Sequence, residues 1–131
     1  MIFLDTSAIY AWADASDANH KASVRRLQAI LSSGADLFTH NYVLVESAAL
    51  IQKRLGLAAA VKFAADTAMF DIEWVDEDLH AAGVAELAKA KKRHLSLVDH
   101  ISFLVMNRRS ISTAFTFDTD FAAMGFRIFV D

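Results

Sequence analysis

Short apolar runs alternate with longer amphipathic segments along this chain. The runs predict strands at residues 2–4, 36–39, 72–75, 114–117 and 127–130. Apolar residues at helical spacing predict helices over 7–13, 20–33, 41–55, 57–69, 78–93 and 96–109, with a helical turn over 119–124. The alternation of strands and helices predicts an α/β fold, a three-layer α/β/α sandwich with a mostly parallel sheet of about five strands.

Local signals indicate where these helices begin and end. Thr6 or Ser7 is the expected N-cap of the first helix, and Asn41 is the expected N-cap of the third. Gly34 and Gly56 follow the last periodic residues of two helices and are expected to end them. The 78–93 helix is acidic at its start and basic at its end, which suits the helix dipole.

Length and composition narrow the possible functions. A chain of 131 residues is long enough to bury one core, so a single domain over 1–131 is expected. The four glycines stand singly, which excludes glycine-rich phosphate loops and argues against a nucleotide cofactor. The absence of cysteine excludes disulfides and thiolate metal sites. We find no signal peptide and no apolar run of about 18 residues, so we expect a cytoplasmic protein with no membrane span.

Carboxylates stand where predicted strands end. Asp5 follows the first strand, Asp118 follows a later one, and Asp120 comes two residues further on. In open α/β sheets the functional site lies outside the carboxyl ends of the strands, so these acids converge if their strands are neighbours. The alternative roles are helix initiation for Asp5 and turn formation for Asp118 and Asp120.

Two more acids belong to helices. The helical neighbours of Glu46 are all apolar or aromatic: Tyr42, Val43, Ala49 and Leu50. Glu46 therefore faces the core or a cleft, unless it lies at the edge of the apolar stripe and reaches solvent. Asp99 follows Ser96 at capping-box spacing, so helix capping is the alternative to a chemical role.

Taken together, these acids indicate metal chemistry. Carboxylates brought together repel one another unless a cation intervenes. A set of oxygen ligands without cysteine or histidine is what Mg²⁺ or Mn²⁺ prefers. Such an ion can activate a water molecule and stabilise the charge on a phosphodiester during its cleavage.

Four segments of the chain resemble the PIN-domain ribonucleases, in particular the VapC-type toxins of toxin–antitoxin modules. The segments are Asp5-Thr6-Ser7-Ala8, Glu46, Leu95-Ser96-Leu97-Val98-Asp99 and Thr116-Phe117-Asp118-Thr119-Asp120-Phe121. Each motif alone is weak, but the four in this order and at these intervals are fairly specific. The resemblance covers essentially the whole chain.

The resemblance implies a PIN-like domain with an endoribonuclease site that depends on Mg²⁺ or Mn²⁺. It assigns catalysis to Asp5, Glu46, Asp99 and Asp118. Asp5 and Asp99 are expected to touch the metal directly, whereas Asp118 and the accessory acid Asp120 act through the metal or its waters. Glu46 is expected to position or deprotonate the attacking water. Ser7 and Thr116 are expected to support the ligands through their hydroxyls.

The same resemblance implies an RNA substrate, a small antitoxin partner and a homodimer. One alternative is a PIN-domain nuclease that acts in RNA processing rather than as a toxin. The other is a catalytically silent interaction domain on the same fold, although all the acids expected for activity are present.

The net charge of -3 argues against broad electrostatic coating of nucleic acid. Without the five acids of the proposed site, however, 11 of the 16 acidic residues remain against 13 basic ones, so the rest of the chain carries +2. Basic residues cluster at Lys89, Lys91, Lys92 and Arg93 and at Arg108 and Arg109. We expect these basic residues either to be solvated at helix ends or to contact the RNA backbone.

Of the five histidines, His100 follows Asp99 directly in the chain. We expect it to be an ordinary, partly exposed histidine.

Overall fold

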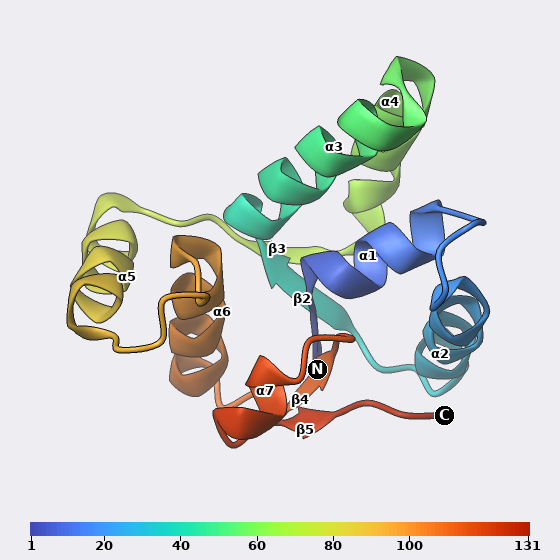
Figure 1. The fold of residues 1–131 in the computed structure, drawn as a ribbon. Coiled ribbons are helices and arrows are strands. Elements are labelled where there is room, and N and C mark those ends of the chain that lie inside the picture. The colour runs from blue at the N-terminus through green and yellow to red at the C-terminus, as the bar shows by residue number, and fades with distance from the viewer.

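Five strands form one parallel sheet in a computed structural model that describes residues 1–131 (Figure 1). The strands are β1 (Ile2–Leu4), β2 (Leu37–His40), β3 (Asp71–Glu73), β4 (Thr113–Phe115) and β5 (Arg127–Ile128). Their order across the sheet is β3-β2-β1-β4-β5, and every neighbouring pair is parallel. Phe3 of β1 pairs with Phe38 on one side and Ala114 on the other. The predicted parallel sheet is confirmed.

Helices cover both faces of this sheet. They are α1 (Thr6–Ala13), α2 (His20–Ser32), α3 (Asn41–Leu55), α4 (Leu57–Asp66), α5 (Glu77–Lys89), α6 (Leu97–Arg108) and α7 (Asp120–Ala123), with a 3₁₀ turn η1 at Thr67–Met69. Figure 1 shows α1 to α4 on one face and α5 with α6 on the other, which confirms the three-layer sandwich. The short α7 joins the second layer, where Phe121 packs edge-to-face on Phe103 of α6. None of the helices is long and apolar enough to cross a membrane.

The capping residues predicted for two helices are wrong. Asp5 caps α1 by accepting a hydrogen bond from the Ser7 backbone N–H, and His40 caps α3 by accepting one from Val43. Each helix starts immediately after a strand, so the last extended residue becomes the cap. The Asn41 side chain accepts a hydrogen bond from the Val75 N–H instead, at 2.6 Å.

Two boundary predictions are also wrong in ways that affect the candidate site. Strand β4 ends at Phe115, so Asp118 lies three residues beyond the strand in the turn before α7. Helix α5 starts at Glu77, capped by Asp76, and ends at Lys89 rather than at residue 93. The exposed Lys91, Lys92 and Arg93 therefore lie in the loop between α5 and α6, beyond the end of the helix dipole they were expected to complement.

The order in which the chain adds strands to the sheet changes direction at β1. From β1 the chain steps outward to β2 and then to β3, whereas β4 and β5 lie on the other side of β1. The crossover helices therefore occupy opposite faces, and a crevice opens between the carboxyl ends of β1 and β4. This is the place in the fold where the loops after these two strands meet.

The core holds 22 buried apolar residues, and helices α5 and α6 approach one another closely at its edge. A Cβ built at Gly83 of α5 overlaps Ile101 Cδ1 of α6 and lies 2.9 Å from Ile101 Cγ1. Ile101 is fully buried. Glycine is therefore required at residue 83 because a side chain there would push the two helices apart.

We expect Gly83→Ala to lower the free energy of unfolding by about 1–2 kcal/mol, because overpacking against the fully buried Ile101 should cost about 2–3 kcal/mol, the upper part of the usual range, and the gain in helix propensity returns about 1 kcal/mol. Urea denaturation measures this change. Ile101→Val removes the overlapping Cδ1, so the double variant should recover part of the loss. A Gly83→Ala protein as stable as the wild type would show that α5 and α6 are not in close contact at this position.

Candidate active site

Asp5 is the most buried carboxylate of the crevice, with 6% of its surface exposed. Its Oδ2 accepts three hydrogen bonds: from the Ser7 N–H at 3.3 Å, from Ser7 Oγ at 2.7 Å and from Thr116 Oγ1 at 2.8 Å. Its Oδ1 accepts none. One carboxylate oxygen is thus held in place by the protein, and the other is left for a ligand.

The same two hydroxyls join the loop after β1 to the loop after β4. Ser7 Oγ accepts a hydrogen bond from the Phe117 N–H, and Thr116 Oγ1 accepts one from the Asp118 N–H, each at 2.9 Å. The Asp5 N–H also donates to the Phe115 carbonyl at 3.1 Å. These bonds fix the backbone of Asp118 relative to Asp5. Ser7 and Thr116, both predicted as supporting hydroxyls, therefore lie directly on Asp5 in the structure.

The remaining aspartates of the crevice come from α6 and from the turn before α7. Asp99 forms the capping box of α6, in which its Oδ2 accepts from the Ser96 N–H at 2.9 Å and its own N–H donates to Ser96 Oγ. Asp118 Oδ1 accepts from the Asp120 N–H at 2.9 Å. The capping and turn roles considered for these acids are thus real. They do not compete with a chemical role, because each of Asp99 and Asp118 keeps one carboxylate oxygen without a hydrogen bond.

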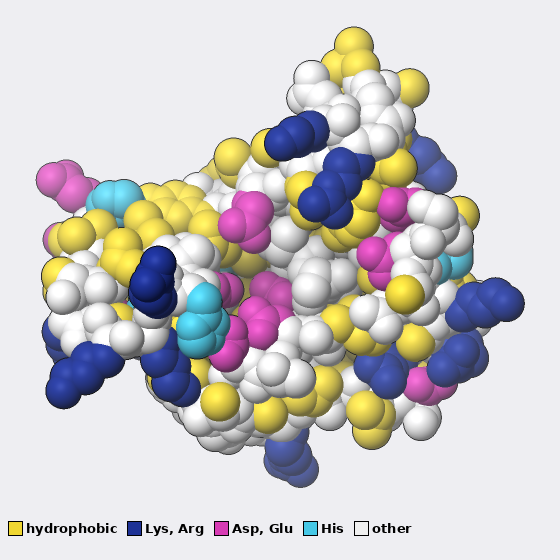
Figure 2. All heavy atoms as spheres, in the orientation of Figure 1, with side chains coloured by type: hydrophobic (Ala, Val, Ile, Leu, Met, Phe, Trp, Pro, Cys, Tyr) yellow, Lys and Arg dark blue, Asp and Glu magenta, His cyan; other side chains and the backbone are white.

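These four aspartates form an electrostatically coupled group. Burial raises the pKa of Asp5 against the hydrogen bonds from Ser7 and Thr116, and the charge of Asp99 adds to the rise. Burial also raises the pKa of Asp118, where the charges of Asp120 and Asp99 add to the effect. Figure 2 shows acidic side chains gathered in a hollow at the centre of this face. A cation bound there would offset the repulsion.

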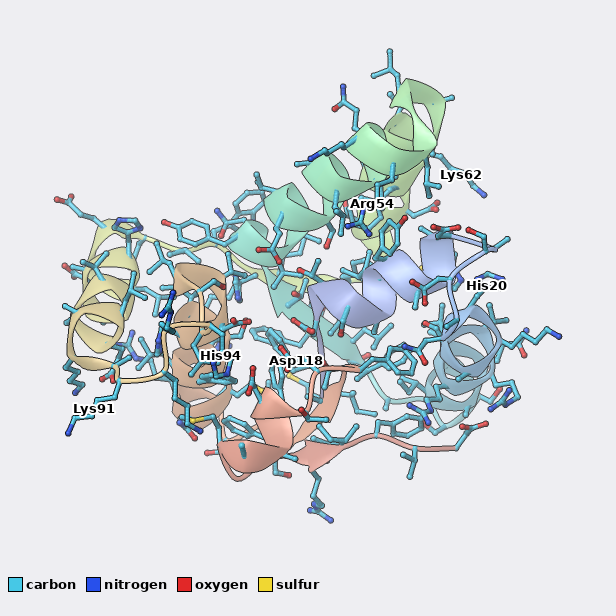
Figure 3. All side chains as sticks on the ribbon, viewed as in Figure 1. His20, Arg54, Lys62, Lys91, His94 and Asp118 are labelled. Carbon is cyan, nitrogen blue, oxygen red and sulfur yellow. The ribbon has the colours of Figure 1, made fainter.

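A histidine that sequence reasoning gave no role lies at the rim of this hollow. His94 Nε2 lies 3.1 Å from Asp120 Oδ1, and this contact is the main cause that lowers the pKa of Asp120. Figure 3 shows His94 and Asp118 on facing sides of the hollow. No sequence spacing indicates the pair, because His94 lies in the α5–α6 loop and approaches Asp120 only through the path of that loop.

His100 differs from its expected role. It is buried, with 7% of its surface exposed, and its Nε2 has no hydrogen-bond partner. Its ring packs edge-to-face on Phe103 at a centroid distance of 6.3 Å. The prediction of a partly exposed histidine is wrong because the middle of α6 is buried on nearly every side, as Ile101, Ser102 and Phe103 are buried as well.

Glu46 lies apart from the four aspartates. The buried positions of α3 are Val43, Ser47 and Ile51, so Glu46 faces outward and is exposed. It lines an open hollow between α1 and α3 with Thr6, Ala49, Leu50 and Lys53. The prediction that Glu46 faces the core is wrong, and the alternative is confirmed: Glu46 lies at the edge of the apolar stripe, reaches solvent and lines an open hollow.

The donor set of the crevice fits a hard divalent cation. The aspartates offer only oxygen, and Asp5, Asp99 and Asp118 each keep one oxygen free of hydrogen bonds. No three Asp, Glu or His side chains stand close enough together to form a complete site by themselves. Mg²⁺ normally binds through one or two carboxylates and keeps several waters or substrate phosphate oxygens, so an incomplete protein shell suits it.

Comparison with known proteins identifies the family. The model of the PIN domain matches residues 2–127, which is nearly the whole chain. The chain belongs to the PIN-domain family. It is 39% identical over 128 residues to the "23S rRNA-specific endonuclease VapC20" of Mycobacterium tuberculosis, in the strains CDC 1551 and H37Rv, and the match covers 96% of this chain and 95% of that protein.

A solved structure agrees with this assignment of the PIN family. The crystal structure of Mycobacterium tuberculosis VapC20, described as a sarcin–ricin loop cleaving toxin, superposes with a TM-score of 0.89. The two chains are 35% identical in that superposition, and each is covered completely. The predicted resemblance to PIN-domain proteins and VapC-type toxins is confirmed.

Proposed function

We propose that this protein is a Mg²⁺- or Mn²⁺-dependent endoribonuclease and the toxin of a toxin–antitoxin module. The main support is the group of aspartates where the loops after β1 and β4 meet. The chain is a PIN domain, and a relative that it matches over nearly its whole length is an RNA-cleaving toxin. The RNA class follows from that relative: 23S ribosomal RNA, at its sarcin–ricin loop. Such a substrate would place the protein in the cytoplasm.

The residues of the crevice have separate tasks in this proposal. Asp5 and Asp99 would hold the cation through their free oxygens, and Asp118 and Asp120 would act through its waters. When bound, Mg²⁺ or Mn²⁺ would supply water activation and charge stabilisation at the phosphodiester. Ser7 and Thr116 keep Asp5 Oδ2 fixed, so that Oδ1 keeps its position. Exposed Glu46 can orient the attacking water from the side of α3.

The experiment is incubation of the purified protein with a labelled RNA hairpin of the sarcin–ricin sequence, with Mg²⁺, with Mn²⁺ and with a chelator. We expect cleavage at one internal bond with either metal and none with the chelator. Cleavage that persists in the chelator would refute the metal dependence. No cleavage under any condition, of this hairpin or of intact ribosomes, would refute the proposed nuclease.

The antitoxin and the homodimer belong to the same proposal. A toxin of this kind needs a small protein that blocks it, whereas an RNA-processing nuclease does not. If a gene for a short protein lies immediately upstream, co-expression with its product should suppress cleavage and yield a stable complex on size-exclusion chromatography. The elution volume of the protein alone tests the homodimer.

A further inference from the structure

Basic side chains flank the acidic hollow on two sides. We propose that the RNA strand crosses the hollow from the end of α3 to the α5–α6 loop, with Lys53 and Lys92 contacting phosphates on opposite sides of the cleaved bond. This inference rests on the proposed nuclease function and adds the path of the substrate. It concerns residues that lie outside the group of aspartates.

The first flank is the end of α3. Lys53 lines the open hollow between α1 and α3 with Glu46 and Thr6, and this hollow adjoins the aspartates because Thr6 directly follows Asp5 in the chain. Glu46 and Lys53 are seven residues apart, which places them on one face of the helix about 10 Å apart. Lys53 is exposed and takes part in none of the ion pairs of the protein. Its charge is therefore available to a ligand that lies in the hollow.

The neighbouring Arg54 does not serve this purpose, because it is already engaged. Its guanidinium lies over the ring of Tyr10, 5.1 Å from the centroid. Figure 3 shows Arg54 directed from α3 toward α1, between the two helices. Lys53 is thus the basic residue at the end of α3 that the structure leaves free in the hollow between α1 and α3, beside the aspartates.

The second flank is the α5–α6 loop. This loop is tied to the site by the contact between His94 and Asp120, and the charge of Lys92 reaches Asp120. Lys92 is exposed and has no ion-pair partner. Lys91 stands beside it in the chain but points away from the hollow (Figure 3). The loop therefore carries one lysine near the acids and one directed elsewhere.

The order of charges across this face suits a nucleic-acid strand. A phosphodiester chain has a negative charge at every nucleotide, so the phosphates next to the cleaved one need cationic partners. The aspartates, with a bound metal, would take the cleaved phosphate at the centre, and the lysines would take its neighbours.

The test is binding of the fluorescent sarcin–ricin hairpin, with Ca²⁺ in place of Mg²⁺, over 50–300 mM KCl. We expect Lys53→Gln and Lys92→Gln each to weaken binding about 3- to 10-fold and to reduce the slope of log K against log salt by about 0.7–1. Single-turnover cleavage in Mg²⁺ should show a raised half-saturating protein concentration and an unchanged rate at saturation. Lys91→Gln and Lys62→Gln are the matched controls, since Lys62 points away from the hollow at α4 (Figure 3).

The outcomes separate this inference from the proposed function. If all four variants lose affinity equally, or none does, the proposed path is wrong even when the wild type cleaves RNA. If the wild type binds RNA and never cleaves it, the nuclease proposal fails, and the salt slopes still report on the path. Equal melting temperatures of the four variants show that the folds are intact.

Discussion

Asp5→Asn is expected to abolish RNA cleavage without lowering the stability of the metal-free protein. The carboxylate is buried, its pKa is raised by that burial, and three hydrogen bonds converge on one oxygen. Asparagine offers an oxygen to the same three donors and removes the buried charge. The loss of a metal ligand should reduce the rate about 100-fold or more, since metal ions supply several kcal/mol of transition-state stabilisation.

Single-turnover cleavage with Mg²⁺ tests the loss of activity, and the melting temperature in a chelator tests the unchanged stability. The matched control is Asp71→Asn, because Asp71 is an exposed aspartate at the opposite, amino-terminal end of a strand. The control should cleave like the wild type. If Asp5→Asn cleaves like the control, Asp5 is not part of the active site. If it melts well below the control in chelator, the Asp5 carboxylate is chiefly a structural group.

The second large effect is a loss of stability at low pH caused by His40. This histidine is fully buried between β2 and α6, where its Nε2 lies 2.9 Å from Ser102 Oγ and its Nδ1 accepts from the Val43 N–H. Ser102 Oγ donates to the Val98 carbonyl, so it accepts from His40 Nε2–H, and the ring is neutral. Burial lowers the pKa of His40 from 6.5 to about 4.

Because this pKa is lower in the folded protein than in the unfolded chain, the unfolded chain binds more protons between pH 6.5 and 4. The contribution of the neutral ring to the unfolding free energy is fully present above pH 6.5, and it is lost as the pH falls from 6.5 towards 4. The linkage relation gives a loss of about 2 kcal/mol at pH 5 relative to pH 8. Urea denaturation of the wild type and of His40→Gln at several pH values isolates the contribution of His40.

The difference in unfolding free energy between these two proteins should shrink by about 2 kcal/mol from pH 8 to pH 5. Parallel stability curves would contradict the assignment. If His40→Gln does not fold, the NMR titration of the His40 ring in the wild type gives the answer directly. A ring that titrates near 6.5 would show that His40 is not held neutral by burial.

The sequence was sufficient to predict the parallel sheet, because its apolar runs indicate strands, its amphipathic stripes indicate helices, and the two alternate along the chain. It also placed Asp5 directly after β1 and Asp118 after β4, although Asp118 lies three residues beyond the strand rather than directly after it, and the parallel topology brings these two loops together. Helix initiation by Asp5 was expected as an alternative role, whereas the cap at His40 could not be predicted, because histidine is not among the residues that N-cap positions favour. The end of α5 could not be predicted either, because lysine and arginine suit both a helix and a loop.

Contacts between segments that are distant in the chain could not be predicted from the sequence. Glu46 occurs in an apolar stretch, but the angle at which α3 packs, with Ser47 inward, leaves the glutamate outside. The pairing of His94 with Asp120 depends on the path of the α5–α6 loop. The burial of His100 depends on how deeply α6 packs into the fold, where Ile101 and Phe103 are buried beside it. Periodicity reports which face is apolar, but it does not report which elements meet there.

The central claim is that the aspartates at the switch point hold a divalent cation. Calorimetric titration of the metal-free protein with Mn²⁺ tests it most directly. We predict saturable binding by the wild type and by Asp71→Asn, and none by Asp5→Asn or Asp99→Asn. Absence of binding by the wild type, or unchanged binding after loss of Asp5, would contradict the account.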